Sequence, residues 1–169
     1  MVKEVRKRVN EPYTRPSKMS LDAFRVIAQQ HQGVIKEKWR IVQKAYGPFL
    51  EEEDIWPDQC NYFIDTMYSM SESVREFYRL LTIGAILPIS ASSLRYPLIM
   101  ALHRIDDLIS NLTSHIVAFR DGCEASSRQR MVQKQEIQCK FEAIVQSSED
   151  ALHNVKVLLD QIRFQEKAV

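Results

Sequence analysis

The sequence predicts an all-α protein that folds as an antiparallel up-down-up-down four-helix bundle with long heptad-patterned helices. Apolar residues recur at steps of three and four in four long segments, which is the pattern of amphipathic helices and coiled coils. Turn-forming residues separate these segments. No segment alternates polar and apolar residues with hairpin turn chemistry, as paired strands would. Helices joined by short connectors pack antiparallel at shallow crossing angles.

Length and composition fit one ordinary domain. A chain of 169 residues is long enough to bury roughly 70% of the surface that it exposes when unfolded. Its composition, 45% hydrophobic and 27% charged, is that of a globular protein. A net charge of +1 gives no overall attraction to nucleic acid or an anionic membrane. Three distant cysteines form no C-x-x-C pair, and the charged N-terminus lacks the apolar core of a secretory signal. We therefore expect reduced thiols and a cytoplasmic protein.

Residues 1–18 are expected to form a basic, flexible arm, because basic side chains outweigh acidic ones there and Pro12 and Pro16 disfavour a helix. The bundle is expected over 19–169. Its first helix, about 20–46, begins with Ser20 as an N-cap, and Gly47 followed by Pro48 predicts its end. The apolar stripe of this helix contains Phe24, Ala28, Val34, Ile35, Trp39, Val42 and Tyr46.

The second helix is predicted over about 57–83, with Pro57 and Asp58 in its first turn. Its heptad stripe contains Phe63, Met67, Met70, Val74, Phe77 and Leu81.

The third helix, about 97–121, begins near Pro97, and apolar residues flank its stripe, so we expect neighbours on more than one side. The connector before it is predicted to be GAILPISASS, residues 84–93. The stripe contains Leu98, Leu102, Ile105, Ile109, Leu112, Ile116 and Phe119.

The fourth helix, about 126–166, would span roughly 60 Å at 1.5 Å per residue, so one end should extend past the bundle. Its stripe contains Ile137, Phe141, Ile144, Ser148, Ala151, Val155, Leu158 and Ile162.

Catalytic chemistry has no candidate residues in this sequence, and we predict neither an enzyme nor a cofactor. The four glycines stand alone, so no phosphate-binding loop is present, and no nucleophile elbow occurs. His103, Asp106 and Asp107 share one helix face. However, the dinuclear metal sites of helical bundles require two E-x-x-H motifs, and the chain contains none. A metal-dependent helical-bundle enzyme is therefore the least favoured alternative.

Protein binding is the function that the pattern favours, by an adaptor or by a self-associating structural subunit that docks helix faces. The candidate partner surface comprises Ile86, Leu87, Ile89, Tyr68 and Tyr78. The three aliphatic residues lie in a turn, where side chains are normally polar. Residues 85–93 either cap the core or form an exposed apolar tip. A transmembrane helix is not predicted over the apolar stretch 80–102, because a span needs about 20 apolar residues and Pro88 and Arg95 interrupt this stretch.

A nucleic-acid-associated filament, capsid or nucleoprotein-like subunit is the alternative from a different class. Its candidate phosphate contacts are Arg128, Arg130 and Lys134, at the start of the fourth helix. Few aromatic residues lie among them, so the sequence indicates contact with the backbone phosphates rather than with bases.

Overall fold

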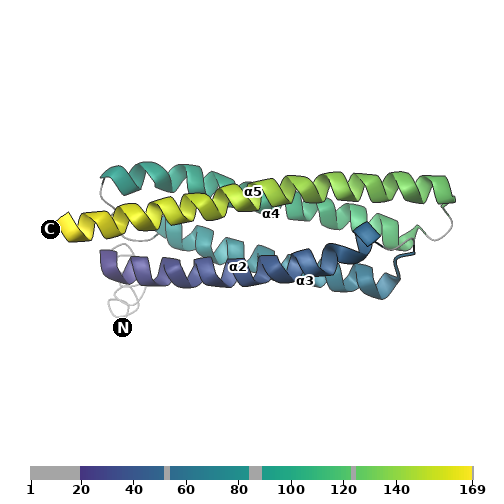
Figure 1. The fold of residues 1–169 in the computed structure, drawn as a ribbon, viewed down its shortest axis with the longest axis horizontal. Helices are drawn as coiled ribbons and strands as arrows, with labels where there is room; N and C mark the ends of the chain where they lie inside the picture. Colours follow the sequence, from purple (N-terminus) through teal and green to yellow (C-terminus); the bar gives the residue numbers. More distant parts are fainter. Residues whose placement is uncertain (1–19, 52–53, 84–88, 123–124, 169) are drawn as a thin grey trace, which may run out of the picture.

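The computed structural model describes residues 20–51, 54–83, 89–122 and 125–168. These residues form four helices and no strand: α2 (Leu21–Glu51), α3 (Pro57–Ile83), α4 (Ile89–Asp121) and α5 (Ser127–Ala168). The helices lie side by side and alternate in direction, which confirms the predicted all-α four-helix bundle (Figure 1). None of the described helices is both long and apolar enough to cross a membrane. The predicted arm, 1–18, lies outside the described residues.

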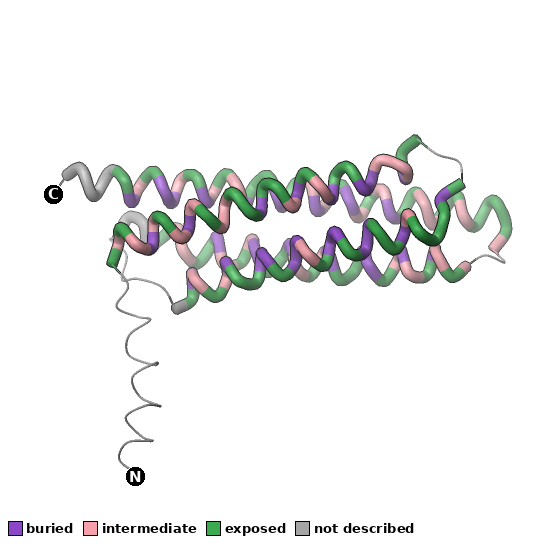
Figure 2. Tube along the Cα trace, turned by 90° about the horizontal axis from the view of Figure 1, so that it is seen from below, coloured by how far each residue is buried: buried purple, intermediate pink, exposed green. Residues whose placement is uncertain are grey.

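Each helix packs against two neighbours, in the closed order α2, α3, α4, α5. The contact between α4 and α5 is the most extensive, and that between α2 and α5 is the least. Buried residues recur along each helix on the side that faces the other helices (Figure 2). The core is therefore a single column along the bundle axis.

The predicted apolar stripes of α3, α4 and α5 are buried along their whole length. In α2 the stripe has one error, because Val34 is 45% exposed while its neighbour Ile35 is 3% exposed. Successive residues of a helix are about 100° apart, so two adjacent side chains do not share one narrow face. Aromatic residues fill one end of the core: Trp39, Tyr46, Phe49, Phe63, Phe119 and Phe141.

The predicted end of the first helix was wrong. Helix α2 continues through Gly47 and Pro48 to Glu51, and no described glycine has the positive φ of a left-handed helix cap. Proline inside a helix costs about 3 kcal/mol. The extension buries Phe49 completely, with its ring 5.2 Å from that of Phe63. Burying a phenylalanine contributes about 1.5–3 kcal/mol, so tertiary packing offsets much of the local stop signal.

The predicted start of the third helix was also wrong. Helix α4 begins at Ile89, about two turns before Pro97, so the end of the predicted connector is helical. The added turns bring Leu94 against the core as a half-buried residue. Pro97 itself is exposed. Helix α3 has the bounds that the sequence favoured, and α5 differs from them by one or two residues.

Candidate interaction surfaces

The predicted partner surface is only partly described. Ile86 and Leu87 lie outside the described residues. Ile89 is the first residue of α4, but its side chain also lies outside the description. The two alternatives for residues 85–93, a buried cap or an exposed apolar tip, therefore both stay predictions.

The two tyrosines of that surface lie in different environments on α3. Tyr68 is 54% exposed. Tyr78 is half-buried, with its ring edge-on to that of His103 at 4.1 Å between centroids. The two residues are ten positions apart, which is about 15 Å along a helix. They do not form one continuous patch.

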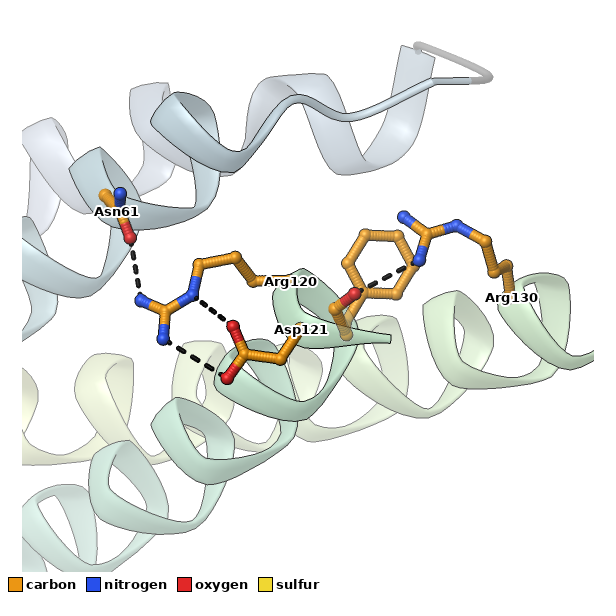
Figure 3. Close-up of polar contacts among 5 residues, drawn as sticks. Asn61, Arg120, Asp121 and Arg130 are labelled. Carbon is orange, nitrogen blue, oxygen red and sulfur yellow. Dashed lines mark hydrogen bonds and ion pairs between the residues drawn. The ribbon is translucent and has the colours of Figure 1, made fainter. Parts of the chain in front are cut away.

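Arg130 stabilises the end of α4. Its Nη1 donates hydrogen bonds to the carbonyl oxygens of Phe119 (3.1 Å) and Gly122 (3.2 Å), and its guanidinium lies 4.1 Å from the centre of the Phe119 ring (Figure 3). The last carbonyl groups of a helix have no partner within the helix, so this arginine acts as a cap.

The other two predicted phosphate contacts, Arg128 and Lys134, differ in exposure. Lys134 is half-buried, and only Arg128 is fully at the surface. In a phosphate surface made of all three residues, Arg130 would contribute only the N–H groups that do not cap α4. Binding of nucleic acid stays a prediction.

A second arginine near the C-terminal end of α4, Arg120, joins α4 to α3. Arg120 donates to Asn61 Oδ1 on α3 at 2.8 Å and to Asp121 Oδ1 at 3.0 Å (Figure 3). The hydrogen bond from Arg120 lowers the pKa of the Asp121 carboxyl group. Sequence reasoning missed this contact because Asn61 and Arg120 are 59 positions apart.

The residues considered for a metal site make a structural contact instead. Asp106 accepts hydrogen bonds from Ser71 Oγ and, at 3.0 Å, from Arg75 Nε, both on α3. His103 packs against Tyr78. Within the described part of the chain, no group of three or more histidine, cysteine, aspartate or glutamate side chains could hold a metal ion.

A groove runs along the outside of the α4/α5 pair, with a volume of about 610 Å³. Its floor is formed by small, less exposed residues, namely Ala101, Ala143 and Ser147. Its edges carry longer polar and apolar side chains. These edge residues are Pro97, Met100, Arg104, Gln146, Asp150 and Asn154.

The lining residues of the groove follow helical spacing on both sides. On α5 they extend from Ala143 to Asn154, which is about 16 Å or three turns. The sequence pattern does not predict this groove, because small residues beside an apolar stripe carry no signal until the neighbouring helix is known.

Comparisons with known proteins identify no relative. No family model matches the chain, and searches of curated proteins and of solved structures also find no match. The function must therefore be inferred from the molecule itself.

Proposed function

We propose that this protein is a non-enzymatic interaction module, an adaptor or a self-associating subunit, that binds an amphipathic helix in the α4/α5 groove. The observation that carries the proposal is the groove itself, with its small-residue floor between two long helices. Helices that bind in grooves insert side chains spaced by three, four and seven residues. The positions that line α4 and α5 have the same spacing.

The groove also indicates what kind of helix would fit. Ala101 and Ala143 leave room for the partner's larger side chains, because helix axes approach to 8–10 Å according to the side chains at the contact. Met100, which is 49% exposed, offers apolar contact at the edge. Arg104 and Asp150 supply charges of opposite sign. We therefore expect a partner helix of about three turns with an apolar face flanked by both acidic and basic residues.

Light scattering of the full chain over a concentration series tests self-association. We expect the apparent mass to rise with concentration in the wild type and to stay at the monomer value in Ala143→Trp, because the indole would fill the groove. Ala118→Trp is the matched control, since Ala118 is exposed on α4 and does not line the groove. Circular dichroism of each variant verifies that the bundle remains folded.

If the wild type is a monomer at every concentration, only the adaptor version remains. A photo-crosslinker at Gln146, on the groove edge, should then join one defined partner in an extract of the source cells. Ala143→Trp should abolish that product and Ala118→Trp should not. If no product depends on the groove, and no self-association occurs, the proposed function is wrong.

A further inference from the structure

A small cavity lies between α3 and α4 and is lined mainly by polar side chains. Its volume is about 220 Å³. Val74 and Leu102, both buried, form its apolar floor, and its polar lining consists of Arg75, Tyr78, Arg79, His103 and Asp106. Neither the groove nor the proposed partner helix uses these residues, since the groove lies between α4 and α5.

Arg75 is held in one orientation at this cavity. Its Nε donates to Asp106 Oδ2 at 3.0 Å, and Asp106 is in turn fixed by the Ser71 hydroxyl, which donates to Oδ1. Asp106 is the less exposed partner, at 19% of its side chain against 55% for Arg75. Because Nε is occupied, the terminal Nη1 and Nη2 groups remain, and they have no hydrogen-bond partner among the residues that the structure describes. A guanidinium offers such a pair of N–H groups to an oxyanion in a bidentate arrangement.

Arg79 adds a second cation one turn further along α3. It is exposed and forms no ion pair within the described ranges. One carboxylate, Asp106, faces two guanidinium groups, so the cavity carries an excess of positive charge. Glu76, which follows Arg75 in the sequence, acts electrostatically on His31 of α2. His103 and Tyr78 complete the lining, with their rings in edge-on contact at 4.1 Å.

We infer that this cavity is a binding site for a phosphate group. Two arginines on successive helical turns, one of them oriented by the half-buried carboxylate of Asp106, supply the charge and the N–H donors that a phosphate requires. The size of the cavity limits the ligand. It exceeds the roughly 30 Å³ that one water occupies, but it is smaller than the approximately 300–1,000 Å³ of sites that enclose a drug-sized ligand. The ligand is therefore inorganic phosphate or the phosphate of a small ester, with the rest of the ester outside the cavity.

The test is a titration of the full chain with inorganic phosphate, in which the NMR chemical shifts of the backbone amides report binding. Sodium chloride keeps the ionic strength constant. We expect saturable shifts at residues 74–79 and 102–106. Arg79→Gln should weaken the affinity about tenfold or more, because hydrogen bonds between charged groups contribute strongly to binding. Phosphoserine, titrated in parallel, should give the same shifts, and a tighter response would identify an ester as the preferred ligand.

Arg40→Gln is the matched control. It removes the same positive charge as Arg79→Gln, but Arg40 lies outside the cavity, on the surface of α2, where it pairs with Glu37. It should leave the affinity unchanged. Arg79→Gln is the decisive variant, since Arg79 makes no ion pair in the described part of the chain that its loss could disturb, whereas Arg75→Gln also removes a link between α3 and α4. Shifts that do not saturate, or an affinity that is equal in the wild type and in Arg79→Gln, would overturn the inference.

Discussion

At the scale of single residues, His31 is the group whose protonation is most clearly coupled to folding. Its imidazole is half-buried on α2, with its ring 5.4 Å from that of Phe77. Burial lowers the pKa of His31 below its ordinary value of 6.5, and the charge of Glu76 opposes this shift. The folded protein therefore holds His31 neutral under conditions in which the unfolded chain already binds a proton.

The expected result is a loss of stability in mild acid. As the pH falls through about 6.5, the unfolded state takes up the proton first. The free energy of unfolding then decreases until the pH reaches the lower folded-state pKa. Urea unfolding at pH 7.5 and pH 5.5 measures this decrease, which should be smaller in His31→Gln and larger in Glu76→Gln. His153→Gln, at an exposed position of α5, should match the wild type. An equal decrease in His31→Gln and the wild type would exclude this coupling.

At the scale of helices, the ends of α2 and α4 show packing overriding local signals. Gly47 followed by Pro48 is typical of a helix end, yet α2 continues for another turn and Phe49 enters the core. Packing in the bundle favours this extension, because the extra turn places Phe49 among the rings of Tyr46, Phe63 and Phe119.

Gly47→Ala tests this account. No heavy atom lies within 4 Å of a Cβ added at Gly47, and the residue is helical without a positive φ. The substitution should raise the free energy of unfolding by about 1 kcal/mol, measured from urea midpoints, because alanine is favoured over glycine inside a helix by that amount. Gly33→Ala, in mid-helix with the same open surroundings, should give a similar gain. If Gly47 instead capped the helix in the left-handed conformation, alanine would be destabilising.

At the scale of the whole molecule, closure of the bundle depends strongly on Phe141. The contact between α2 and α5 is the least extensive of the four. Phe141 on α5 lies 3.7 Å from Tyr46 and 5.6 Å from Trp39, measured between ring centroids, and meets Phe63 of α3 edge-on. Burial raises the pKa of Tyr46 to about 12, as expected for a phenol in a dry aromatic cluster. One side chain thus joins three helices.

Phe141→Ala should therefore reduce the free energy of unfolding by about 3–5 kcal/mol and open the α2/α5 contact. Tryptophan fluorescence reports the opening. In a Trp56→Phe background, which removes the exposed indole, the emission of Trp39 should shift to longer wavelength. Phe24→Ala removes another fully buried ring, far from Trp39 on α2. It should cost similar stability without the spectral shift, and an unshifted spectrum in Phe141→Ala would contradict the role given to this residue.

The candidate sites were much harder to predict than the core. Tyr78 and Arg130 were singled out from the sequence as partner and phosphate contacts, but their observed contacts are with His103 and with the end of α4. Asp106 was recognised only as part of a polar helix face, whereas the structure pairs it with Arg75. Each of these contacts joins two different helices or the end of one helix to the next, and sequence periodicity contains no information about which turn of one helix faces which turn of the next.

The sequence by itself determined the fold class, the number of described helices and most of the core, because heptad spacing places apolar side chains on one face of each helix and those faces must be buried together. The tertiary structure decided where α2 and α4 end and begin, that Ile35 rather than Val34 enters the core, and where the groove and the cavity lie. These features depend on the register between helices. The free energy gained by filling the core, as at Phe49, offsets much of the local cost of glycine and proline inside the helix.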